Sequence, residues 1–321
     1  MYSGSARIRI AELLPWLVAA AVYFLAPTYL PLGGYVMIMI LFALSLDLIV
    51  GYGGIVTLGH SAYFGLGAYT AGIFAVRVHG DPLLGLLAAA LAAALFGAIT
   101  GAVILRTRAL TLLMLTLAIT SIVYEVASSV WASPLTGGSD GLHSVPVQPV
   151  LGLFKFDMFG KTAYLYCLVV LAVCWWIVRT VVHSPFGAAL VGSRENPARM
   201  EAIGAPVYRR RLVAYTLSCG LAGVAGATLT HTTAFAGLST LGFEISGEVL
   251  VMLVLGGVGR LYGAFLGPMV YIVARDYLAK QTPEYWTMGI GVLLVLIVLF
   301  ARGGMLGLAD AFAKRYSRGK K

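Results

Sequence analysis

Apolar stretches of helical length recur along the chain, separated by short polar or glycine-rich breaks. A helix that crosses the hydrocarbon core needs about 20 mostly apolar residues, so this repetition predicts an all-α polytopic membrane protein. The first stretch continues through Pro15 and Trp16 without a small-residue cleavage site, and we expect it to be retained. The stretches run at roughly 11–31, 33–50, 61–79, 83–105, 109–131, 162–182, 211–234, 246–259, 262–279 and 285–301.

Two hydrophilic interruptions divide a single transmembrane domain that covers residues 1–321. The basic residues of the 183–211 loop predict that this loop is cytoplasmic, because Lys and Arg stay on that side of short loops, and the 133–161 loop is then external. The N-terminus, with Arg7 and Arg9, and the basic tail at about 302–321 are also expected inside. A glycine-rich break at 256–260 makes the number of crossings even, which predicts about ten transmembrane helices.

The composition agrees with a membrane protein and excludes other classes. The chain is 60% hydrophobic and 11% charged, with a mean hydropathy of +0.91. Its net charge of +9 arises at helix ends and in the tail, so we expect membrane lipid and no nucleic acid as a partner. The cysteines Cys167, Cys174 and Cys219 lie in apolar stretches without metal-ligand spacing, and no metal site is expected.

The 183–211 loop contains the signals of a short helix. Asn196 can cap free amides, Pro197 suits the first helical position, Gly204 ends the helix and Pro206 prevents its continuation. Such a helix is either part of a solvated connection or a rigid element that docks on a cytoplasmic partner. The other side chains in and beside it are charged or apolar: Arg194, Glu195, Arg199, Met200, Glu201 and Ile203.

A second glycine-rich segment, residues 51–67, interrupts helical regularity near a membrane boundary. Backbone groups freed by a broken helix must face protein or water, and broken helices often surround substrate routes. The alternative is that these glycines only allow tight helix packing. The candidate residues of a substrate pathway are Asp47, Thr57, His60, Ser61 and Tyr63.

These motifs resemble those of the permeases of branched-chain amino acid ABC importers, the group that includes urea and amide transporter permeases. The matching segments are Arg194-Glu195-Asn196 with Gly204, the block from Gly51 to Tyr69, Thr136 to Gly141, Leu255 to Gly259, and Gly303 to Gly307. Asp47 is a departure, since a neutral Asn is expected there. The resemblance implies the ABC importer permease fold and makes Arg194, Glu195, Asn196, Arg199, Glu201 and Gly204 the residues expected to couple to the ATPase.

The resemblance further implies a multi-pass subunit of the bacterial inner membrane that forms half of a path for a small polar solute. Its expected partners are a second related permease, two cytoplasmic ATPase subunits that bind ATP and Mg, and an external solute-binding protein. That binding protein would set selectivity among branched-chain amino acids, urea, amides and aromatic acids.

No catalytic pattern accompanies these motifs. Gly160-Lys161-Thr162 looks like the end of a phosphate loop, but Lys155 stands where the required upstream glycine would be. We therefore expect a transport subunit with no ATPase site and no cofactor in this chain. The alternative is an ion-coupled secondary transporter, which would use carboxylates in or near the spans: Asp47, Glu125, Glu244, Glu248 and Asp276.

Overall fold

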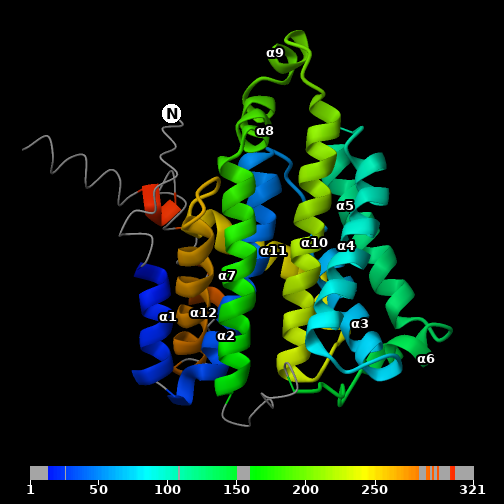
Figure 1. The fold of residues 1–321 in the computed structure, drawn as a ribbon, viewed down its shortest axis with the longest axis vertical. Coiled ribbons are helices and arrows are strands. Elements are labelled where there is room, and N and C mark those ends of the chain that lie inside the picture. The colour runs from blue at the N-terminus through cyan, green and yellow to red at the C-terminus, as the bar shows by residue number, and fades with distance from the viewer. Residues whose placement is uncertain are drawn as a thin grey trace, which may run out of the picture.

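The computed structural model describes residues 14–25, 27–107, 109–149 and 160–281, with short pieces at 287–289, 291–292, 295 and 304–307. Apart from an isolated bridge between Leu142 and Ala236, the regular elements of these residues are helices (Figure 1). The longer helices are α1 (Leu14–Leu25), α2 (Leu30–Asp47), α3 (Ser61–Arg77), α4 (Pro82–Ile104), α5 (Ala109–Ser128), α7 (Lys161–His183), α10 (Val207–Thr233), α11 (Phe243–Gly256) and α12 (Gly263–Gln281). The shorter elements are α6 (Ser133–Thr136), α8 (Pro185–Glu195), α9 (Pro197–Ala202), η2 (Pro27–Tyr29), η3 (Leu48–Tyr52), η4 (Gly138–Asp140) and η5 (Leu238–Leu241).

The predicted all-α membrane architecture is confirmed. Five helices of the described residues are long and apolar enough to cross a membrane: 27–52, 82–104, 110–128, 161–183 and 207–233. The predicted stretches at 61–79, 246–259 and 262–279 correspond to α3, α11 and α12. The first stretch was predicted too long, because Pro27 begins a separate short turn after α1. Most of the predicted 285–301 span and the 302–321 tail lie outside the described residues.

The predicted break near residue 257 is present. α11 ends at Gly256, and α12 begins only at Gly263. Gly257 and Gly259 both have positive φ, at 118° and 76°, a conformation that residues with a side chain rarely adopt. A Cβ on Gly304 would lie 2.5 Å from the Cα of Gly257, so the glycine-rich segment near the C-terminus packs on this break. The chain therefore turns here instead of forming one helix over 246–279.

Small residues bring the central helix α10 close to α3 and α4. A Cβ on Gly97 of α4 would lie 2.5 Å from the Cβ of Cys219, and a Cβ on Gly223 would lie 2.5 Å from that of Ala93. A Cβ on Gly226 would lie 2.9 Å from the Ala68 nitrogen of α3. These contacts leave no room for larger side chains, so α10 is the axis around which the neighbouring helices pack.

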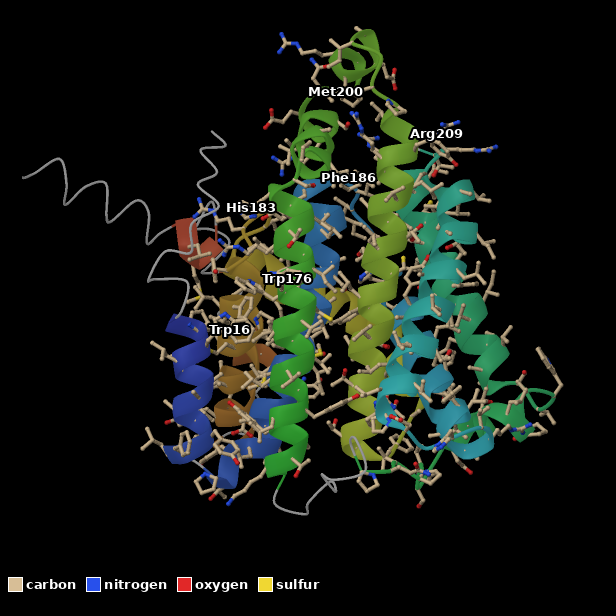
Figure 2. All side chains as sticks on the ribbon, in the orientation of Figure 1. Trp16, Trp176, His183, Phe186, Met200 and Arg209 are labelled. Atoms are coloured by element: carbon tan, nitrogen blue, oxygen red, sulfur yellow. The ribbon has the colours of Figure 1, made fainter. Side chains whose placement is uncertain are left out.

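The polar loops lie at opposite ends of the helix bundle. α8 and α9 project at one end, while α6 and the start of α7 lie at the other (Figure 1). Tyr208, near the start of α10, donates a hydrogen bond of 2.8 Å to the Ala102 carbonyl of α4, so the basic turn after α4 lies at the end with α8 and α9. Figure 2 shows Met200 and Arg209 at this same end. The basic residues of the 183–211 loop and of the turn after α4 thus lie at one end of the bundle (Figure 1).

Candidate functional site

The short helix expected in the 183–211 loop is present as α9, with Asn196 as its N-cap. The Asn196 Oδ1 accepts a hydrogen bond of 3.0 Å from the Arg199 amide, and Pro197 occupies the first turn. This side chain satisfies an amide that has no partner within the helix, which fixes where α9 begins.

Gly204 closes α9 at its other end. Its φ is 80°, and its amide donates to the Glu201 carbonyl over 2.9 Å while the Ala205 amide donates to the Met200 carbonyl over 3.0 Å. This pair of bonds is a Schellman motif, which requires the left-handed conformation that glycine adopts most easily. The helix ends at Ala202, one residue before the predicted end, and it is capped at both termini.

The loop also contains a helix that the sequence reading missed. α8 begins after Ser184, whose hydroxyl accepts from the Gly187 amide, and Pro185 follows at the first helical position. The Ser-Pro pair was the available signal. Arg211 of α10 donates to the Ser193 carbonyl over 2.9 Å, and Met200 packs on Gly192. α8 and α9 therefore form one compact unit joined to the start of α10.

Arg194 does not point away from the protein, although the sequence placed it among the partner-facing residues. Its guanidinium donates to the Gly51 carbonyl in η3, and the Arg194 stem lies over Gly54. The contact with neighbouring Glu195 is longer, at 3.9 Å, between exposed groups. An exposed ion pair of this kind contributes little to the free energy of unfolding. Arg194 thus joins α8 to the interrupted end of α2.

Asp47, at the end of α2, reaches the turn between α11 and α12. Its Oδ1 accepts a hydrogen bond of 2.7 Å from the Gly259 amide, and its side chain is 1% exposed. A Cβ on Gly51 would overlap this carboxylate and lie 2.5 Å from the Gly259 nitrogen. Gly51 therefore permits the close approach of η3 to the turn between α11 and α12.

The other candidate pathway residues lie in the bundle interior, on α3 and the non-helical segment before it. The His60 Nε2 lies 2.9 Å from the Ser45 Oγ of α2 and 3.5 Å from the Ser218 Oγ of α10. The Ser61 amide donates to the Ser246 Oγ over 2.7 Å. All four serines and His60 are buried. A buried polar network thus joins α2, α3, α10 and α11. The sequence identified His60 and Ser61 as candidates but not their serine partners.

Tyr63 and Thr57 complete the candidate set. The Tyr63 hydroxyl lies 2.8 Å from the Thr100 Oγ1 and 2.9 Å from the Tyr215 hydroxyl, while Thr57 accepts from the Gly59 amide over 3.1 Å. Both residues are 1% exposed. The candidate set is therefore closed to solvent in this structure.

Two cavities lie away from these residues. One, of about 500 Å³, has an almost wholly apolar lining from α4, α7 and α10. Another, of about 400 Å³, lies between the end of α3 and the 133–161 loop, beside His79 and Gln148. The first suits hydrocarbon better than a polar solute.

Two of the carboxylates considered for ion coupling form ion pairs. Glu248 lies 2.6 Å from the Arg275 Nη1, and Asp276 lies 2.6 Å from the Lys280 Nζ. Glu125 and Glu244 are exposed. An ionisable group inside a membrane needs a partner or a watery surface, and the two ion pairs supply partners without a transported ion.

The fold is that of a polytopic helical membrane protein, and the 183–211 loop adds a compact unit of two helices, α8 and α9, at one end. The family model described as "Branched-chain amino acid transport system / permease component" matches residues 30–299. The chain belongs to this family, which confirms the resemblance inferred from its motifs. It is a transport subunit rather than a catalytic enzyme.

Individual relatives agree with the family. The chain is 28% identical over 299 residues to the high-affinity branched-chain amino acid transport system permease protein LivM of Escherichia coli (strain K12), covering 84% of this chain and 68% of that protein. LivM of Salmonella typhimurium gives the same values. The autoinducer 2 import system permease protein LsrC of Klebsiella pneumoniae is 29% identical over 175 residues, covering 53% of this chain and 48% of that one. No solved structure matches significantly.

Proposed function

We propose that this chain is the inner-membrane permease of an ATP-driven importer for branched-chain amino acids or related small polar solutes. It forms half of the translocation path with a second, related permease. Two cytoplasmic ATPase subunits bind ATP and Mg, and an external binding protein delivers the solute. Membership of the permease family and similarity to LivM support this assignment.

The main observation that supports coupling to an ATPase is the helix α9, which is capped at both ends. α9 projects from the bundle (Figure 1). Arg199 and Glu201 on this helix are exposed. Ile203, at its end, is 72% exposed, so its side chain is accessible to a partner. A rigid helix that combines charges with an exposed apolar residue offers a partner both specificity and buried area. We place ATPase docking on α9 and expect both chain termini on this cytoplasmic side.

The solute path is proposed to border the broken segment before α3. The buried hydroxyl and imidazole groups of Thr57, His60 and Ser61 supply hydrogen-bonding capacity there, on a backbone that is not helical from 53 to 60. Irregular backbone inside a membrane is tolerated where protein or a water-filled path surrounds it.

Charge reversal on α9 tests the docking proposal. Glu201→Lys and Arg199→Glu should reduce both ATPase co-purification and solute uptake at matched membrane levels, because each removes a polar contact worth about 1 to 3 kcal/mol if it is buried in the interface. Arg106→Glu is the matched control, since Arg106 is an exposed arginine at the same end of the bundle but outside the 183–211 loop. Full assembly and uptake in both α9 variants would refute docking at this helix.

A further inference from the structure

The Gly51 region joins three parts of the chain that are far apart in sequence. η3 follows α2, the 256–263 turn separates α11 from α12, and α8 belongs to the 183–211 loop. Arg194 bonds to the Gly51 carbonyl, and Asp47 accepts from the Gly259 amide. These two bonds tie α8 to one interrupted helix and that helix to the next.

The glycines of this region hold the parts at backbone distance. A Cβ on Gly54 would overlap the Cγ of Arg194 and lie 3.2 Å from its Cβ and Cδ. A Cβ on Gly259 would lie 3.3 Å from the Gly51 oxygen and 3.4 Å from the Arg194 Nη1. Arg194 therefore contacts this region both along its stem and at its guanidinium.

We propose that Arg194 and Asp47 are positioning residues that form a latch, which transmits movement of α8 and α9 to the two interrupted helices. The proposal rests on the proposed function, since it assumes that an ATPase moves α9. α8 and α9 move as one unit because Asn196 is both the C-cap of α8 and the N-cap of α9, and because Met200 packs on Gly192. When this unit moves, the bond from Arg194 displaces η3, and the bond from Asp47 displaces Gly259 in turn.

The chemistry of the two bonds suits this role. Each pairs a polar side chain with a backbone group that a helix interruption leaves free, and the guanidinium charge makes the Arg194 bond stronger than one between neutral groups. A displaced latch would leave a buried carboxylate without its donor, so separating η3 from the 256–263 turn is unfavourable. The three elements are therefore expected to move together rather than one at a time.

The test uses the assembled importer with all its subunits in proteoliposomes. Arg194→Met keeps an apolar stem over Gly54 but removes the donor, and Asp47→Leu removes the acceptor. Both should retain the ATPase and its hydrolysis while solute uptake per ATP hydrolysed falls about tenfold, the ratio expected when one charge-assisted bond is lost. Asp47→Asn keeps an oxygen acceptor and should retain most of the coupling.

A second measurement separates the latch from a merely structural role. Val56, in the broken segment, is 45% exposed, so Val56→Cys reports movement there by thiol labelling. The labelling rate should change at least about threefold between the nucleotide-free and ATP-bound importer, and this change should vanish in Arg194→Met. The double variant Arg194→Met with Asp47→Leu should be no worse than either single variant, because both bonds lie on one route.

The outcomes distinguish the latch from α9 docking. Wild-type uptake per ATP in assembled Arg194→Met, or losses that multiply in the double variant, would overturn the latch. Loss of ATPase co-purification in Arg194→Met would also overturn it and make Arg194 a docking contact. Docking itself is judged separately by co-purification of Arg199→Glu, a residue that has no part in the latch.

Discussion

The closest contact of α10 with α3 gives a sharp prediction about packing. A Cβ added to Gly226 would overlap the Phe64 carbonyl oxygen. It would also lie 2.8 Å from the Phe64 carbonyl carbon and 2.9 Å from the Ala68 nitrogen. Ordinary contact between carbon atoms needs about 3.5 Å, so α3 and α10 would have to separate by at least about 0.7 Å. Both neighbours are backbone atoms, which cannot turn away as a side chain can. We expect Gly226→Ala to cost about 3 kcal/mol or more, the upper range for overpacking.

Gly220→Ala is the matched control in the same helix. A Cβ there would lie 3.4 Å from the Ala90 oxygen and from the Ala94 Cβ, which is ordinary contact. Alanine is also the better helix former by about 1 kcal/mol, so Gly220→Ala should be neutral or slightly stabilising. The assay is the temperature at which half of the detergent-purified protein remains monodisperse. Equal midpoints for the two variants would refute the assignment of Gly226 to a backbone contact.

Three further predictions concern the topology, the energy supply and the end of α9. An impermeant thiol reagent outside intact cells should label Ser139→Cys and not Ser317→Cys, and labelling of position 317 would refute cytoplasmic termini. The purified chain alone should not hydrolyse ATP, so hydrolysis that survives removal of contaminating ATPases would contradict the assignment of that activity to a partner. Gly204→Val should reduce coupled uptake at normal membrane levels, since valine opposes the φ of 80° by about 1 kcal/mol or more; wild-type uptake would show that the Schellman end is unimportant.

Much of the fold was predictable because membrane helices are encoded locally. Hydrophobic length and basic flanks located most of the described spans to within a few residues, and the glycines at 256–260 correctly placed the break before α12. The caps of α9 were equally local, since Asn196 and Gly204 act within three residues of their own positions. α8 was not predicted because the charged residues of the 183–211 loop indicated a connection, although apolar residues such as Leu190 and Val191 lie within it.

The contacts of the candidate residues were not predictable in the same way. Arg194 and Gly51 are 143 positions apart, and Asp47 and Gly259 are 212 positions apart. No local pattern in a single sequence pairs residues at such separations. The sequence therefore assigned Arg194 to the docking loop and Asp47 to the solute path, whereas the structure brings both to Gly51. Their proximity follows from the packing of η3 between α8 and the 256–263 turn.

The buried polar residues near the helix interruptions share a structural task. Four backbone groups freed there are satisfied by side chains: the Gly51 carbonyl by Arg194, the Gly259 amide by Asp47, the Gly59 amide by Thr57 and the Ser61 amide by Ser246. A polar residue in a membrane interior can thus be needed to complete the backbone, without contacting a solute.

The candidate pathway residues differ in how many of their side-chain polar atoms have hydrogen-bond partners. Thr57 and Ser61 already have partners for their side chains, whereas the Asp47 Oδ2 and the His60 Nδ1 have no hydrogen-bond partner among the residues that the structure describes. A buried polar atom without a partner raises the free energy of the state that contains it. Opening of the helices would expose these two atoms to water or solute and relieve that cost. Asp47 and His60 are therefore the candidates whose hydrogen bonding should change most between the closed and open states of the permease.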